Sequence, residues 1–164
     1  MAQKKSLAIS ACLLGHKVRY DGSHQENEII KRLTKCLNII PVCPEVEIGL
    51  GVPREKVELH QQELQIHLLT TNKPVIDLTE QMIAYAQIFL NNHKISGMIL
   101  KDKSPSCGVG NCKQYDVSGG MQRNGTGIFA ATIMQLKPDL PMLQSNLVIQ
   151  ASDLDYFMQQ VNEY

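Results

Sequence analysis

Short apolar runs alternate along this chain with segments in which apolar residues recur every three or four positions. The runs are typical of strands buried on both faces of a parallel sheet, and they lie at residues 7–14, 39–42, 95–100 and 142–143. The periodic segments predict helices at about residues 23–37, 78–93, 125–136 and 152–161. This alternation predicts a three-layer α/β fold, Rossmann-like, in which a mostly parallel sheet lies between layers of helices.

Two segments depart from this alternation. Residues 57–68 change between apolar and polar at every second position, which predicts a small antiparallel hairpin with its turn near Gln61 and Gln62. Residues 101–124 are rich in glycine, serine and lysine and carry no clear periodicity. Irregular segments of this length in compact domains usually serve function, so we expect residues 101–124 to contribute to a site.

Size and charge narrow the class of protein. The chain has 164 residues, and we expect residues 1–164 to form a single domain with a sizeable core. Basic and acidic residues balance at 16 each, so the chain lacks the positive excess typical of general nucleic-acid binders. No apolar run approaches the length of a membrane span, and no signal-peptide core follows the N-terminus, which predicts a cytoplasmic protein without a membrane partner. Nothing in the sequence indicates an oligomeric state.

Three of the five cysteines have similar surroundings. Cys12 lies near the end of the first apolar run, Cys43 ends the second, and Cys107 lies in the loop after the third. Because open parallel α/β sheets bind ligands at the carboxyl ends of their strands, we expect the three thiols to meet in one crevice. Thiolates favour zinc, copper(I) and iron–sulfur clusters, and a cluster held by three thiolates keeps one iron open to a substrate atom.

The cysteines also have simpler interpretations. A buried free cysteine often only fills space in a core, and Cys36, near the end of the expected first helix, fits that description. Cys112 follows Cys107 by five residues and fits a fourth ligand, a disulfide partner of Cys107 or a bystander. The chain has no Cys-x-x-Cys pair, so the spacing does not favour a structural zinc knuckle.

Polar residues beside the thiols suit a reaction on a small molecule. Glu45 follows Cys43 by two residues, and a carboxyl in a dry crevice is suited to proton transfer, although an ordinary loop carboxylate fits the spacing equally well. Ser104 and Ser106 lie just before Cys107 and either donate hydrogen bonds to a substrate or shape the turn. Glu45, Ser104 and Ser106 are therefore candidate site residues.

Two further features are candidates for substrate binding. Arg19 and Arg54 follow the first two strands and could clamp a carbonyl or an anion through two hydrogen bonds, although structural ion pairs are equally compatible. Gly125, Thr126 and Gly127 open the expected third helix, whose first N–H groups could bind an anionic or carbonyl oxygen, although a plain helix start has the same pattern. Both features predict contacts to an oxygen-bearing or anionic ligand.

Several short motifs follow one another along the chain. They are Cys-Leu-Leu-Gly from Cys12, Val-Arg-Tyr-Asp-Gly from Val18, Cys-Pro-Glu-Val from Cys43, Gly-Leu at Gly49, Pro-Arg at Pro53, Lys-Ser-Pro-Ser-Cys-Gly from Lys103, Tyr-Asp at Tyr115 and Gly-Thr-Gly from Gly125. With these motifs the chain resembles the family long catalogued as domain of unknown function 523, whose characterised members are thiouracil desulfurases. The likeness spans nearly the whole chain, and the Cys-Pro-Glu and Lys-Ser-Pro-Ser-Cys-Gly blocks together make it specific.

The resemblance implies an iron–sulfur enzyme. It implies a [4Fe–4S] cluster held by Cys12, Cys43 and Cys107, whose fourth iron binds the sulfur of a thiocarbonyl substrate, a small-molecule thiolated base such as 2-thiouracil. Water would attack the carbon, sulfide would leave onto the iron, and the oxo product would depart without net electron transfer. The resemblance further implies that Glu45 shuttles the proton and that Ser104 positions substrate or water. A sample prepared in air can lack the cluster.

The chain departs from the family pattern at a few positions. Val117 stands where the family usually has a glycine after Tyr-Asp, Ile48 stands in place of a second glycine, and Cys112 adds a thiol. We expect these positions along the pocket rim, where they bear on substrate choice rather than on cluster binding. Two other classes of function use the same thiols: a non-catalytic metal or cluster carrier or redox sensor, and a zinc-dependent hydrolase.

Overall fold

The computed structural model describes residues 4–164, and its centre is a four-stranded parallel sheet, sheet A, with the strand order β2–β1–β5–β8. Its strands are β1 (Ser6–Ser10), β2 (Asn38–Val42), β5 (Gly97–Leu100) and β8 (Met142–Gln144). Side chains alternate along β1, so that Leu7 and Ile9 join one apolar cluster and Ala8 joins another. All three are fully buried, which explains the continuous apolar run.

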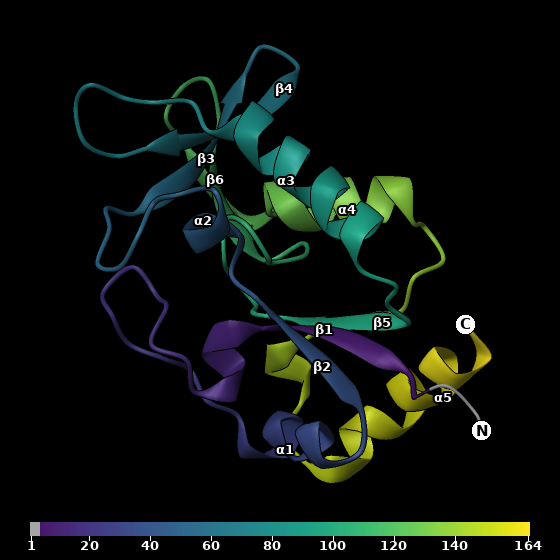
Figure 1. Cartoon of the computed structure of the whole chain (residues 1–164). Helices are drawn as coiled ribbons and strands as arrows, with labels where there is room; N and C mark the ends of the chain where they lie inside the picture. Colours follow the sequence, from purple (N-terminus) through teal and green to yellow (C-terminus); the bar gives the residue numbers. More distant parts are fainter. Residues whose placement is uncertain (1–3) are drawn as a thin grey trace.

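Helices cover both faces of sheet A (Figure 1). The face of Ala8 packs against α3 (Thr79–Asn92) and α4 (Ile128–Leu136). The opposite face packs against α1 (Glu28–Lys31) and α5 (Asp155–Glu163). The short helical turns are η1 (Ala11–Leu14), η2 (Arg32–Lys35), α2 (Pro44–Glu47), η3 (Ser145–Leu147) and η4 (Ala151–Leu154). This arrangement confirms the predicted three-layer α/β fold with a mostly parallel sheet.

A second sheet, sheet B, has the strand order β4–β3–β6–β7. Its strands are β3 (Val57–Gln62), β4 (Gln65–Thr70), β6 (Cys112–Tyr115) and β7 (Met121–Gly125). β3 and β4 form the predicted antiparallel hairpin, β6 runs parallel to β3, and β7 returns antiparallel to β6. The hairpin is therefore half of a larger mixed sheet.

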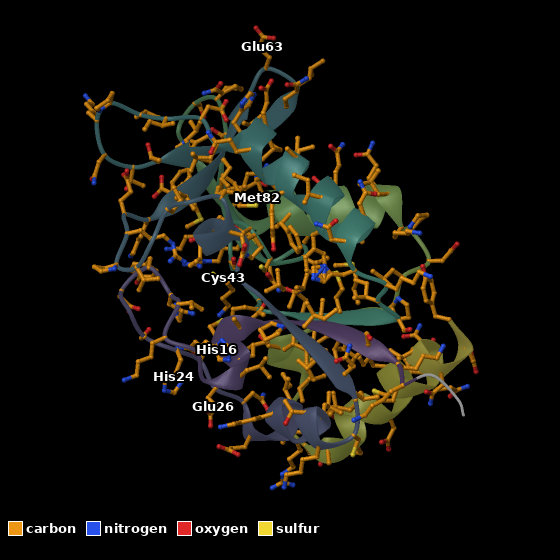
Figure 2. All side chains as sticks on the ribbon, in the orientation of Figure 1. His16, His24, Glu26, Cys43, Glu63 and Met82 are labelled. Atoms are coloured by element: carbon orange, nitrogen blue, oxygen red, sulfur yellow. The ribbon has the colours of Figure 1, made fainter. Side chains whose placement is uncertain are left out.

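One apolar core joins the two sheets. Ala8 and Met98 of sheet A belong to the same buried cluster as Leu59 and Leu68 of sheet B, and Met82 of α3 lies among them. In Figure 2, Met82 lies between α3 and the strands of sheet B. The shared core fixes sheet B next to sheet A and so helps to shape the space between them.

Some boundaries differ from those that the sequence predicts. β1 ends at Ser10 because the chain turns into η1, which Gly15 closes with a φ of 93°. The helix predicted over residues 23–37 is confined to α1 and η2, because the side chain of Asn27 caps the first N–H groups of α1. The shortened helix leaves residues 15–27 as a loop.

The second half of the chain shows two similar differences. The hairpin turns at Glu63 and Leu64 rather than at Gln61 and Gln62, with Glu63 in the left-handed region at a φ of 55°, and Figure 2 shows Glu63 at the tip. The segment 101–124, predicted to be irregular, contains β6 and most of β7. Its Lys-Ser-Pro-Ser-Cys-Gly portion remains a loop between β5 and β6.

Candidate functional site

Three strand ends of sheet A open onto one cavity of about 460 Å³. Cys12 lies in η1 directly after β1, Cys43 lies between β2 and α2, and Cys107 lies in the loop after β5. All three line this cavity, and Figure 2 shows Cys43 in the interior of the molecule. The expectation that these cysteines meet in one crevice at the carboxyl ends of the strands is therefore met.

Burial favours the protonated form of all three thiols. It raises the pKa of Cys12 to about 11, although the Arg19 charge partly opposes this effect. Burial also raises the pKa of Cys43 and lifts the pKa of Cys107 well above its ordinary value, with the Ser10 hydroxyl partly offsetting the latter. The Cys43 thiol also raises the pKa of Cys12, and Cys12 and Cys43 both raise the pKa of Cys107, as expected of thiols that lie near one another.

The donor set around the cavity fits a sulfur-ligated group larger than one ion. Within residues 4–164, no group of three or more His, Cys, Asp or Glu side chains is arranged to hold a single metal ion. All three thiols line one cavity, and soft thiolates suit iron–sulfur clusters. Arg19 also lines the cavity, and its buried Nε has no hydrogen-bond partner among the described residues. An orphaned buried donor beside thiols indicates a missing acceptor, so the site fits a cofactor or ligand.

Glu45 lies in α2, two residues beyond Cys43, and both of its carboxylate oxygens are engaged. Oε2 accepts a hydrogen bond of 2.7 Å from Arg54 Nε, and Oε1 accepts one of 2.9 Å from Ser106 Oγ. The side chains of Arg54 and Glu45 are only 6% and 12% exposed, so this ion pair is largely shielded from water. Proline at the first position of α2 starts the helix here and holds Glu45 at the cavity wall.

Ser104 shapes the loop that carries Cys107. Its Oγ accepts hydrogen bonds from the backbone N–H groups of Ser106 and Cys107, at 3.2 and 3.1 Å. An acceptor hydroxyl still has its own proton to donate, and Ser104 lines the cavity. Ser104 can therefore both fix the turn and donate to a ligand, whereas Ser106, only 1% exposed, donates to Glu45.

The structure separates the roles predicted for the two arginines. Arg54 is fully engaged: Nη1 donates to the carbonyl oxygens of Val18 and Gly51 at 2.8 and 2.9 Å, and Nη2 lies 4.0 Å from Cys43 Sγ. Arg19 lines the cavity, and its Nε is shielded from water and has no hydrogen-bond partner among the described residues. Arg19 thus has a donor that no described protein group uses, whereas Arg54 holds protein groups.

The helix predicted to open at Gly125 begins at Ile128, because Gly125 still belongs to β7 and Gly127 is the N-cap of α4. The cavity walls in the described part of the chain do not include Gly125, Thr126 or Gly127. The N–H of Gly127 donates to Gly108 O, and the N–H of Ile128 donates to Pro105 O. The structure therefore does not bring these three residues to the cavity, and the N–H groups of Gly127 and Ile128 hold the Cys107 loop instead.

A polar network at the end of β5 was not predicted from the sequence. Lys101 Nζ donates to Asp102 Oδ1 at 2.7 Å, and Ser145 Oγ donates to the same oxygen at 2.7 Å. The backbone N–H of Lys101 donates to Ser10 Oγ, which joins the network to β1 beside Cys107. The sequence did contain one indication of this network, because Lys101 and Asp102 directly follow a buried strand.

Neither of the remaining two cysteines is part of the described cavity wall. Cys36 is exposed, and all five cysteines are free. Cys112 is fully buried, and its Sγ donates to Ser104 O at 2.9 Å. The structure thus forms no Cys107–Cys112 disulfide, and Cys112 supports the loop of Ser104.

The electrostatic balance of the cavity is positive, whereas the whole chain is neutral. Its acidic side chains are Glu45, Glu58 and Asp102, and its basic ones are Arg19, Arg54, Lys56, Lys101, Lys103, Lys113 and Arg123. Such a cavity favours negative charge on the groups inside it.

Fold and site together define an α/β protein with a thiol-lined pocket at the carboxyl ends of its parallel strands. A protein-family model described as 2-thiouracil desulfurase matches residues 7–145, and the chain belongs to that family. Uncharacterized protein YbbK of Bacillus subtilis (strain 168) is 34% identical over 140 residues, covering 79% of this chain and 89% of that protein.

A solved structure shares the fold as well. TudS, a [4Fe-4S]-dependent thiouracil desulfidase, aligns with a TM-score of 0.71 and 26% identity, over 95% of this chain and 99% of the TudS chain. The family assignment suggested by the sequence motifs is thus confirmed. Among residues 4–164, no helix combines the length and the apolar character needed to cross a bilayer.

Proposed function

We propose that this protein is an iron–sulfur-dependent desulfurase that converts the thiocarbonyl group of a 2-thiouracil-like base to a carbonyl group. One observation carries the proposal: Cys12, Cys43 and Cys107, far apart in the sequence, line one cavity together with Glu45. Membership of the 2-thiouracil desulfurase family and the likeness to a [4Fe-4S]-dependent desulfidase support it. We further propose that the chain forms a single domain, since one core cluster contains residues of both sheets.

Cys12, Cys43 and Cys107 would hold a [4Fe–4S] cluster. Three protein ligands leave one iron without a protein ligand, and the bound cluster supplies a Lewis acid for the substrate sulfur. The three thiols must each lose a proton to bind iron, which their raised pKa values oppose. The charge of Arg19 assists this loss at Cys12, and the charge of Arg54 assists it at Cys43.

The protein residues would bind the base and move protons. The net reaction adds water to the thiocarbonyl carbon and releases hydrogen sulfide, so the C=S bond is replaced by C=O without a change of oxidation state. Glu45 would take a proton from the attacking water and deliver it to the leaving sulfur. Ser104 would donate a hydrogen bond from its hydroxyl to substrate or water, and Arg19 Nε would donate to the ligand.

Anaerobic purification and a turnover assay test the proposal. The protein should carry iron and acid-labile sulfide and convert 2-thiouracil to uracil plus sulfide, measured by chromatography and a sulfide assay. Glu45→Gln should lose conversion while keeping its cluster, and Glu47→Gln, on the same short helix but outside the cavity wall, should remain active. A cluster-bearing protein that binds thiouracil without releasing sulfide would instead support a non-catalytic carrier.

A further inference from the structure

We infer that Arg54 is a positioning residue of the desulfuration reaction: its guanidinium fixes the Glu45 carboxylate against the cluster-binding end of β2. The inference rests on the proposed function and extends it. A positioning residue is identified by the groups that it holds in place. Arg54 donates to Glu45 and Val18, which line the cavity, and to Gly51 in the loop after α2.

The guanidinium distributes its donors over these segments. Nε donates to Glu45 Oε2 at 2.7 Å in α2, while Nη1 donates to Val18 O at 2.8 Å and to Gly51 O at 2.9 Å. Nη2 lies 4.0 Å from Cys43 Sγ, whose thiol also faces Val18 O at 3.7 Å. One side chain thus connects the carboxylate, a predicted ligand thiol and the two loops beside them.

Burial makes this geometry rigid. The Arg54 side chain is 6% exposed, and its own backbone N–H donates to Tyr20 O at 2.9 Å, so both ends of the residue are held. A planar guanidinium offers fixed donor directions, which a flexible ammonium lacks. Lysine at position 54 would keep the charge but could not reach Glu45, Val18 and Gly51 together.

The contacts on Glu45 explain why its position matters. Ser106 Oγ holds Oε1 from the Cys107 loop while Arg54 holds Oε2 from the other side. Glu45 is therefore clamped between two segments that each carry or contact a predicted cluster ligand. Loss of one clamp lets the carboxylate rotate away from the reacting water, and a displacement of about 1 Å can cost roughly 100-fold in rate.

The test compares Arg54→Lys with wild-type protein, using Arg32→Lys as the matched control because Arg32 is exposed and lies outside the cavity wall. Each protein is purified anaerobically, its iron and sulfide content per chain is measured, and kcat and KM for 2-thiouracil are determined. The expected result for Arg54→Lys is unchanged cluster content, a KM within about twofold and a kcat lowered roughly 10- to 100-fold. Added guanidinium should partly restore kcat in Arg54→Ala.

Three outcomes would overturn the inference. If Arg54→Lys has the same kcat as wild-type protein, the fixed donor directions of the guanidinium are dispensable. A loss of cluster matching the loss of kcat would show that Arg54 only supports Cys43. A raised KM with unchanged kcat would show that Arg54 binds substrate, as the sequence first suggested.

Nuclear magnetic resonance of the cluster-free wild-type chain gives a test that needs neither turnover nor a folded Arg54 variant. The Arg54 Nε–H signal should exchange slowly with solvent and shift in Glu45→Gln, whereas Glu47→Gln should leave it in place. An Arg54 Nε–H signal that exchanges rapidly with solvent and does not shift in Glu45→Gln would contradict the inference. By contrast, cluster-bearing wild-type protein that releases no sulfide from 2-thiouracil would overturn the proposed function itself.

Discussion

Gly127 packs directly against Ser106: a Cβ at position 127 would overlap the carbonyl group of Ser106 and lie 2.7 Å from Cys107 N. The N–H of Ala130 donates to Ser106 O at 3.0 Å, so the first turn of α4 is bonded to the loop at this point. Glycine is therefore needed at position 127 because the loop backbone occupies the space of a side chain. This packing places Cys107 in the cavity wall.

Gly127→Ala should displace the Cys107 loop. Overpacking against backbone costs about 1–3 kcal/mol of the free energy of unfolding, and the displaced thiol should weaken cluster binding. Gly125→Ala is a milder comparison, since its added Cβ would meet Gln114 Oε1 at 3.0 Å and the backbone oxygen of Cys112 at 3.2 Å, both farther away than the Cys107 N that a Cβ at position 127 would meet. Denaturant unfolding and iron content measure both effects. Equal stability and iron content in the two variants would contradict the packing argument.

The cluster-free thiols should differ in reactivity. Cys36 is exposed, whereas Cys12 is buried and has its pKa raised to about 11, so about one in a thousand Cys12 side chains is a thiolate at pH 8. Iodoacetamide should modify Cys36 at least about tenfold faster than Cys12 or Cys107. Peptide mass spectrometry over time measures the rates. Comparable rates at Cys36 and Cys107 in folded protein would show that the cavity is not closed around its thiols.

Asp102 should contribute to acid stability. Burial by itself raises the pKa of Asp102, but hydrogen bonds from Lys101 and Ser145 outweigh it, so the pKa lies below its ordinary value. A carboxyl whose folded pKa is lowered stabilises the protein above its unfolded pKa of about 4, and the contribution is lost as pH falls through the folded value.

Asp102→Asn should therefore be less stable than wild type at pH 7, and the difference should shrink as the pH falls below about 4. Thermal unfolding of the cluster-free proteins between pH 7 and pH 3 measures this. Ser152→Ala, an exposed change on η4, serves as a control for the measurement. Parallel curves for Asp102→Asn and wild type across that range would rule out a role for the carboxylate charge.

The Glu45–Arg54 pair should also stabilise the fold. Removing one partner from a shielded ion pair leaves the other charge uncompensated, which commonly costs about 3–5 kcal/mol. Arg54→Ala should therefore lower the free energy of unfolding of the cluster-free chain by an amount near the lower end of that range, because Glu45 keeps its bond from Ser106. Chemical denaturation measures it, and a change below about 0.5 kcal/mol would place the pair in the class of weak surface bridges.

The sequence predicted the fold best where burial on both faces of a strand requires a continuous run of apolar residues. The run around Leu7 and Ile9 predicted a strand covered on both faces, and strand ends are where parallel sheets place their ligands, which located Cys12, Cys43 and Cys107. Periodicity failed where caps and turns decide, as at Asn27, whose side chain starts α1 later than the apolar pattern suggested.

Side-chain partners could not be predicted from spacing. Arg19 and Arg54 follow similar strands in the sequence. Only the structure shows that Arg54 donates to Glu45, Val18 and Gly51, whereas Arg19 Nε has no partner among the described residues. Gly127 likewise carried a plausible anion-binding pattern, but the tertiary contact with the Cys107 loop uses the N–H groups that a ligand would need. Such assignments depend on contacts between segments far apart in the chain.

The most direct test of the central claim is the iron and acid-labile sulfide content of five single Cys→Ser variants reconstituted without oxygen. Wild-type protein, Cys36→Ser and Cys112→Ser should each bind about four iron atoms per chain. Cys12→Ser, Cys43→Ser and Cys107→Ser should each lose most of their iron. A cluster that survives in Cys107→Ser but disappears in Cys36→Ser would contradict the account.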